Sequence, residues 1–146
     1  MTAPSSRVLL HSGWQTVNIG DIGHTPGTLR YLEQAWPAAR VTLWLANTTP
    51  AVTAMLRRRF PHRPLSRAAL TGKGLASTPA LQDAFDACEV FIQNSGMHFN
   101  RFWDPPMHLL DACHTAGKML CLYGQSFDGL PPGTKPHCPP AFLRLP

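Results

Sequence analysis

The residues best suited to chemistry lie in a polar, glycine-containing stretch near the N-terminus, residues 13–26. This stretch follows the apolar run Val8–Leu10 and contains Asn18 and Asp21 among its three glycines. Thr25-Pro26 has the composition of a helix start, because threonine caps a helix and proline fits its first position. A glycine-rich loop that leads into a helix commonly holds a phosphate or a carboxylate. The stretch therefore predicts a ligand-binding loop, although a tight turn between a strand and a helix has a similar composition.

Two further polar stretches follow apolar runs later in the chain, at residues 94–98 and 124–126. If the apolar runs are parallel strands, all three stretches leave the same edge of one sheet, where such sheets bind ligands. Turns at that edge favour the same residue types, so a plain set of turns stays an alternative. We expect a substrate-binding cleft at this edge and assign no catalytic residue. The candidate binding residues are Asn18, Gly20, Asp21, Asn94, Ser95, Gly96, His98, Gln125 and Ser126.

Several of these side chains have a purely structural interpretation as well. Asp21 is equally suited to an Asx-type hydrogen bond within its own loop. Lone loop histidines such as His24 and His98 are more often solvated than bound to a ligand. A zinc site is disfavoured, because His108 and His114 are six residues apart rather than the four that aim two imidazoles at one ion.

The elements that must position these residues alternate between short apolar runs, typical of buried strands, and amphipathic helices. Such alternation implies right-handed crossovers. It predicts an α/β, Rossmann-like fold with a mostly parallel sheet and helices on both faces. The predicted strands are residues 8–10, 41–45, 68–70 (a weak one), 90–92 and 119–123, and the predicted helices begin at Pro26, Pro50, Pro79 and Asp104, with Gly117 ending the last.

The order of these motifs resembles the polysaccharide pyruvyl transferases, which carry an Asn-(Ile/Val)-Gly-Asp loop after an early strand, matched here by Asn18-Ile19-Gly20-Asp21. That family often has an acidic residue next, whereas this chain has Ile22. Of the family's glycine-rich turn after the fourth strand, only Gly96 matches. Its Gly-Gln-Ser-like turn after the fifth strand is matched by Gly124-Gln125-Ser126. The resemblance covers about residues 7–130.

Members of that family transfer a pyruvyl group from phosphoenolpyruvate to a sugar hydroxyl of a surface polysaccharide. The resemblance implies a carbohydrate acceptor, phosphoenolpyruvate as donor substrate, and no metal or organic cofactor. It also implies that this chain is similar to one half of a GT-B-like two-domain enzyme, because the family's donor-binding arginines and histidines lie largely in its second domain. We therefore expect the isolated chain to be inactive without a missing C-terminal domain or partner chain.

Near residue 130 the character of the sequence changes. Residues 1–130 predict one α/β domain, whereas residues 131–146 contain six prolines and no usable periodicity. Such a composition is typical of an irregular or disordered tail. Because the family resemblance ends where the proline-rich sequence begins, we expect this chain to be a truncated or frameshifted part of a longer enzyme.

Composition bounds the remaining possibilities. The 146 residues are 44% hydrophobic and only 14% charged, with a formal net charge of +5, which suits a globular domain that buries one side against a partner. No aromatic residues interleave with the basic cluster Arg57-Arg58-Arg59, so nucleic-acid binding is not expected. The sequence shows no signal peptide, membrane-spanning run or CxxC pair, so we expect a cytoplasmic protein with reduced thiols.

Two other classes of protein stay open. The first is a Rossmann-like module that binds a sugar or a nucleotide without chemistry, or half of a GT-B-type glycosyltransferase. Against a nucleotide, Gly13, Gly20 and Gly23 are too widely spaced for the GxGxxG fingerprint. The second is a structural protein that docks onto a partner through a sheet edge or an apolar face.

Overall fold

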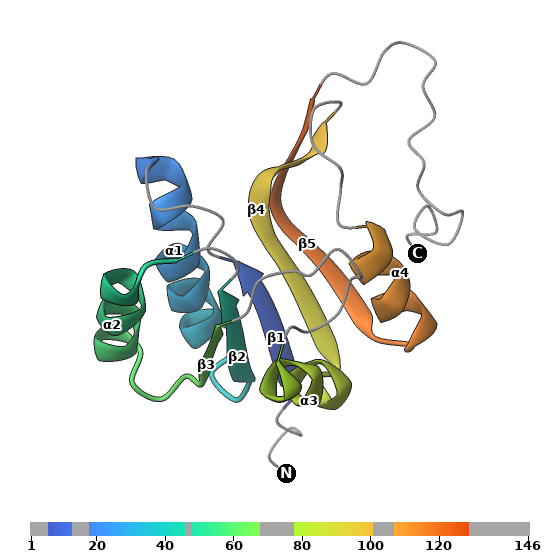
Figure 1. Ribbon diagram of the computed structural model, residues 1–146, viewed down its shortest axis with the longest axis horizontal. Coiled ribbons are helices and arrows are strands. Elements are labelled where there is room, and N and C mark those ends of the chain that lie inside the picture. The colour runs from blue at the N-terminus through green and yellow to red at the C-terminus, as the bar shows by residue number, and fades with distance from the viewer. Residues whose placement is uncertain (1–5, 13–17, 46–47, 68–77, 101–106, 129–146) are drawn as a thin grey trace.

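A computed structural model describes residues 6–12, 18–45, 48–67, 78–100 and 107–128 of the chain (Figure 1). These residues form one five-stranded sheet with the strand order β3-β2-β1-β4-β5, in which every neighbouring pair is parallel. The strands are β1 (Arg7–Ser12), β2 (Arg40–Leu45), β3 (Leu65–Arg67), β4 (Val90–Asn100) and β5 (Met119–Asp128). The helices are α1 (Ile19–Ala35), α2 (Pro50–Arg59), α3 (Pro79–Ala87) and α4 (Met107–Thr115).

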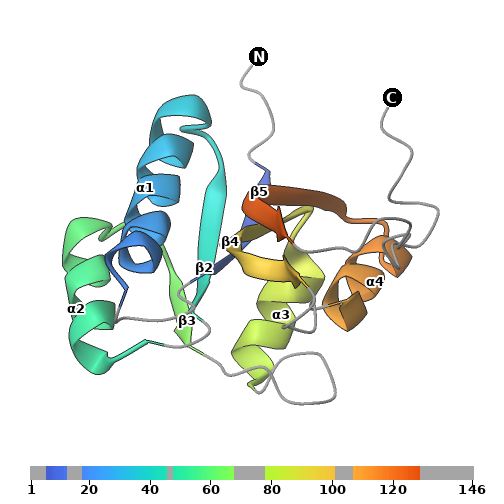
Figure 2. The same cartoon turned by 90° about the horizontal axis from the view of Figure 1, so that it is seen from above.

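Helices cover both faces of the sheet, with α1 and α2 on one side and α3 and α4 on the other (Figures 1 and 2). Alternate residues of a strand point to opposite faces, so the buried residues divide into two clusters. Val8 and Leu10 of β1 pack with α1 and α2, whereas Leu9 packs with α3 and α4. The predicted α/β, Rossmann-like fold with a parallel sheet and helices on both faces is therefore confirmed.

Strand β1 lies at the centre of the sheet, with Leu10 opposite Leu43 of β2 on one side and Ile92 of β4 on the other. The chain crosses from the β2–β3 side to the β4–β5 side through α3, which packs on the opposite face from α1. The strand order therefore reverses between β1 and β4. In open parallel sheets, ligands bind in the crevice that such a reversal leaves at the carboxyl ends of the strands.

Two predicted helix starts are confirmed, those of α2 and α3. Thr49 and Thr78 each accept a hydrogen bond, at 3.3 Å, from the backbone N–H three residues further on. Pro50 and Pro79 take the first position of the two helices. Each cap satisfies one of the backbone N–H groups that a helix start leaves without an intrahelical partner.

The predicted start of the first helix is wrong. Helix α1 begins at Ile19 rather than at Pro26, so Gly20 and Asp21 lie in its first turn and not in a loop. Asn18 is the cap, because its side-chain oxygen accepts a hydrogen bond from the backbone N–H of Gly20 at 2.9 Å. Asp21 adds a negative charge where the helix dipole favours one. The helix continues through Pro26, which removes one backbone donor.

Strands β4 and β5 are longer than predicted. The polar stretches that the sequence predicts as loops continue these strands and pair with each other, with Asn94 opposite Tyr123 and Gly96 opposite Gln125. Their composition is typical of turns, but pairing with a neighbouring strand outweighs such local preferences. Because β1 pairs with β4 only as far as Gln93, β4 and β5 extend beyond it as a two-stranded ribbon (Figure 1).

Some predictions concern residues outside those that the structure describes. They are the loop at 13–17, the weak strand at 68–70, the helix start at 104–106 and the proline-rich residues 131–146. The strand found in that part of the chain is β3, at Leu65–Arg67. Among the described residues, no helix is long and apolar enough to cross a membrane, and no group of His, Cys, Asp and Glu side chains is suited to hold a metal ion.

Helix α4 ends at Thr115, and Gly117 takes the C′ position that terminates it, as predicted from the sequence. The backbone N–H groups of Gly117 and Lys118 donate to the carbonyls of His114 at 3.0 Å and Cys113 at 2.9 Å, which is the Schellman arrangement. Gly117 has a φ of 64°, in the left-handed region that favours glycine.

Replacing Gly117 with alanine should lower the free energy of unfolding. A Cβ at this position would meet no atom within 4 Å, so the cost is that of the backbone conformation alone, about 1–2 kcal/mol. Urea denaturation of Gly117→Ala measures it. Gly117→Asn is the matched control and should cost less, because asparagine tolerates the left-handed region. Equal stability of wild type and Gly117→Ala would contradict this account.

Two buried cysteines, Cys88 and Cys113, lie in the cluster that packs with α3 and α4. Burial raises the pKa of both thiols, that of Cys113 to about 12. The folded state therefore holds the Cys113 proton more tightly than the unfolded state, in which a thiol titrates near 9.0.

It follows that the stability linked to the Cys113 thiol is fully present below pH 9 and falls as the pH rises toward 12. Chemical denaturation between pH 7 and about pH 10.5 should show this decline. In Cys113→Ala the decline should be shallower, since the titrating group is gone. Parallel pH profiles of the two proteins would show that Cys113 does not contribute.

Candidate functional site

A network of buried polar side chains joins α1 to the carboxyl end of β1 and to the middle of β4. Asn94 donates through Nδ2 to Ser12 Oγ at 2.8 Å and to the backbone oxygen of His24 at 3.3 Å. Its Oδ1 accepts from Thr28 Oγ1 at 2.9 Å, and the hydroxyls of Ser12 and Thr25 are 2.7 Å apart. We call Ser12, Thr25, Thr28 and Asn94 the Asn94 network. Because its members are buried and bond to one another, they fix the three elements in one arrangement.

A second buried polar pair lies on the other face of the same two strands. His11 Nδ1 and Gln93 Oε1 are 2.9 Å apart, and the His11 ring stacks on Trp44 with ring centroids 4.0 Å apart. Both side chains of the pair are fully buried. They join β1 to β4 on the face of the sheet that α3 and α4 cover. The pair therefore holds these two strands together on the face opposite the Asn94 network.

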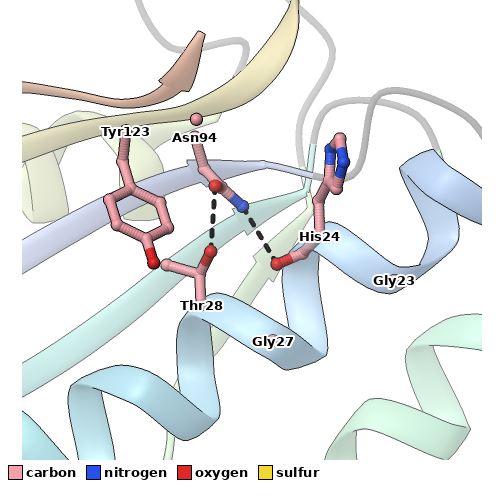
Figure 3. Close-up of a pocket in the computed structure, with 7 residues that line it drawn as sticks. Gly23, His24, Gly27, Thr28, Asn94 and Tyr123 are labelled. Atoms are coloured by element: carbon pink, nitrogen blue, oxygen red, sulfur yellow. Dashed lines mark hydrogen bonds between the residues drawn. The ribbon is translucent and has the colours of Figure 1, made fainter.

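A cavity of about 240 Å³ lies beside the Asn94 network, between α1 and the strands β4 and β5 (Figure 3). It therefore lies on the α1 side of the sheet, next to the point where the strand order reverses. Figure 3 shows the Asn94 carboxamide between the Tyr123 ring and His24. The lining residues are Gly23, His24, Gly27, Thr28, Asn94, Tyr123 and Gly124.

His24 brings an imidazole to the cavity. This side chain is 41% exposed, and its Nδ1 lies 4.0 Å from Oδ1 of Asp21, one turn earlier in α1. This separation is longer than a hydrogen bond. Imidazole is the side-chain group that most often transfers protons in enzymes.

The described lining of the cavity combines three glycines and a tyrosine ring with the polar residues His24, Thr28 and Asn94. Of the described residues that line it, none is lysine or arginine. The carboxamide of Asn94 and the hydroxyl proton of Thr28 are already engaged in the Asn94 network. A phosphate bound here would find no cationic side chain among the described lining residues.

The structure brings only part of the predicted site to this cavity. Asn94 lines it, with its amide engaged in the Asn94 network. Asn18 and Gly20 form the cap of α1, and Asp21 reaches the cavity only through His24. The remaining predicted residues continue the strands, and the β4–β5 pairing shifts register between Gly96 and Phe99. These are Ser95, Gly96 and His98 in β4 and Gln125 and Ser126 in β5.

Sequence reasoning missed most of the residues that α1 contributes to the cavity. From the sequence, His24 is expected to be solvated, and no motif there draws attention to Gly27 or Thr28. A helix that begins at Ile19 puts Gly23 and Gly27, and likewise His24 and Thr28, four residues apart on one side. The capping signal of Asn18 was therefore the clue that would have found them.

Comparisons with known proteins add no relative. No family model matches the chain, and no curated protein and no solved structure matches it either. The fold and the cavity define the class of this protein as an α/β, Rossmann-like domain with a cavity between α1 and the strands β4 and β5.

Replacing Asn94 with leucine should lower the free energy of unfolding by about 3 kcal/mol, because the buried Thr28 hydroxyl loses its acceptor and the Ser12 hydroxyl loses one of its two partners. Denaturation in urea measures the loss.

The matched control is Gln82→Leu. It removes an amide on α3 whose hydrogen bond to Asp86 is exposed to solvent and should cost less than about 0.5 kcal/mol. Similar losses in the two variants would show that the Asn94 network does not hold the fold together.

Proposed function

We propose that this chain is the N-terminal, acceptor-binding half of a polysaccharide pyruvyl transferase. The observation that carries the proposal is the position of Asn18-Ile19-Gly20-Asp21, the residues on which the family resemblance rests. These residues cap and open α1, and Asp21 lies 4.0 Å from His24 at the cavity. The strand order β3-β2-β1-β4-β5 agrees with one half of a GT-B-like enzyme.

Pyruvyl transfer converts phosphoenolpyruvate and two sugar hydroxyls into a ketal and inorganic phosphate. Each sugar oxygen forms a bond to C2 of the enolpyruvyl group, and the bond from C2 to the phosphate oxygen breaks. One hydroxyl proton is delivered to C3, which becomes a methyl group, and the other leaves with the phosphate. In this proposal His24 accepts a hydroxyl proton from the sugar, beside the Asp21 carboxylate. No metal or organic cofactor takes part.

The donor site belongs to a second domain or a partner chain. Phosphoenolpyruvate carries a phosphate and a carboxylate, and both call for cationic side chains. The described lining of the cavity has neither lysine nor arginine. We therefore expect this chain to be inactive alone, and we place the complete enzyme in the cytoplasm.

A sugar- or nucleotide-binding module without chemistry is the second candidate, as is half of a GT-B-type glycosyltransferase. One observation favours simple binding: among the described residues that line the cavity, His24 is the one histidine, and none is Asp, Glu, Lys or Cys.

The test is phosphoenolpyruvate-dependent pyruvylation by the native product from its source cells, with any partner that purifies with it. The acceptor is the surface polysaccharide of the same cells after mild acid has removed its ketals. We expect release of phosphate and a new methyl signal in the proton NMR spectrum of the polysaccharide.

His24→Gln should lower this rate by about 100-fold or more, because it removes the proton acceptor. His62→Gln, at an exposed position after α2, is the matched control and should leave the rate unchanged. Binding of a nucleotide without release of phosphate from phosphoenolpyruvate would instead favour the binding module.

A further inference from the structure

Two tyrosines from different elements stack beside the cavity. The rings of Tyr31 in α1 and Tyr123 in β5 have centroids 5.8 Å apart and an interplanar angle of 20°. They are 51% and 39% exposed. Tyr123 lines the cavity, whereas Tyr31 is outside its lining. Tyr31 therefore supports the Tyr123 ring from outside the cavity and limits the orientations that the ring can adopt.

On the side of α1 that leads to this tyrosine pair, two positions in successive turns are glycines and carry no side chain. Gly23, Gly27 and Tyr31 are spaced by four residues and so lie on one side of the helix. Gly23 and Gly27 line the cavity, and a Cβ on either would meet no atom within 4 Å. Contacts among the described residues therefore do not require glycine at these positions, and glycine is a poor helix former. The effect of the two glycines is to keep the space beside Tyr123 open.

These features combine an aromatic surface with groups that bond to hydroxyls. Tyr123 offers an aromatic ring, Thr28 offers the lone pairs of a hydroxyl whose proton bonds to Asn94, and His24 also lines the cavity. A pyranose has the matching chemistry, because its C–H groups pack on an aromatic ring and its hydroxyls bond to polar side chains. The base of a nucleotide would also stack, but its phosphate would find no lysine or arginine in the described lining.

We propose that this cavity holds a single pyranose ring packed on Tyr123, with Gly23 and Gly27 as its floor and Tyr31 as a positioning residue. The inference rests on the proposed function, because it gives the acceptor cleft of that function a defined binding mode. It also makes Tyr123 a residue that determines specificity, since a ligand without a ring of C–H groups loses the stacking contact.

The first test uses ¹⁵N-labelled full-length chain and three probes: methyl β-D-galactopyranoside, glycerol and AMP. We expect the galactopyranoside to shift the backbone amide signals of Gly27 and Gly124 in a saturable way. Glycerol, which has hydroxyls but no ring, should not shift them at the same concentration. Stronger binding of AMP than of the galactopyranoside at these amides, or equal shifts from glycerol, would overturn the inference.

Variants of the two tyrosines separate stacking from stability. Tyr123→Ala should weaken galactopyranoside binding by about threefold to tenfold, the range expected for loss of an aromatic contact. Tyr123→Phe keeps the ring and should bind within about twofold of wild type. Tyr31→Ala should weaken binding less than Tyr123→Ala does. Unchanged affinity of Tyr123→Ala would count against the proposed binding mode.

The sharpest variant is Gly27→Ala, because its effects on binding and stability should have opposite directions. A methyl group at this position narrows the cavity, so galactopyranoside binding should fall by at least about tenfold. The same change improves helix propensity and should raise the Tm by about 2–5 °C. Gly117→Ala, which lies outside the cavity, should lower the Tm and leave binding unchanged. Normal binding by a stabilised Gly27→Ala would overturn the inference.

Failure of this inference and failure of the proposed function give different results. If the native enzyme with Tyr123→Ala transfers pyruvate at the wild-type rate and acceptor affinity, the binding mode is wrong and the proposed function stands. If the galactopyranoside binds as described but no phosphate is released from phosphoenolpyruvate, the proposed function fails and the pyranose site remains.

Discussion

The rest of the structure depends on the hydrogen bonds of one buried carboxamide, that of Asn94. Its partners are Ser12 in β1 and, one turn apart in α1, the backbone oxygen of His24 and the hydroxyl of Thr28. A buried amide that lost these partners would be strongly destabilising, so the helix can pack on the sheet in only one rotation. That rotation turns Thr25 and Thr28 toward the strands, and it leaves Gly23 and Gly27 facing the cavity.

Helix α1 owes little of its stability to its own sequence. Its first nine residues include three glycines and Pro26, all of which are poor helix formers. Cooperative helix formation would be marginal for such a segment in isolation. The Asn18 cap at one end, the Asn94 network in the middle and the buried Leu29 and Leu32 further on compensate for it. The low intrinsic stability of α1 and the cavity beside it have one origin. The glycines that disfavour the helix also leave no side chain to fill the cavity.

The sequence was informative where the signals are local and misleading where they compete. Apolar runs located β1, β2, β4 and β5, and the caps at Thr49 and Thr78 located two helices. At the start of α1, two possible caps, Asn18 and Thr25, lie seven residues apart. Which of them begins the helix depends on the contact of Thr25 with Ser12, which exists only after folding. The cavity was beyond prediction for a similar reason. Its lining depends on the rotation of α1 and on the pairing that sets Tyr123 opposite Asn94.

The hydrogen bond between Ser12 and Asn94 joins positions that are 82 residues apart, and this separation has a consequence for how the protein is made. The elements from β1 to β3 emerge first during synthesis, and β1 then has its second edge open until β4 arrives. Contacts this distant in sequence form slowly. An unpaired apolar edge in a nascent chain invites wrong pairing and chaperone binding. The central pair of the sheet is therefore assembled late, and the cavity is complete only when β4 and β5 are in place.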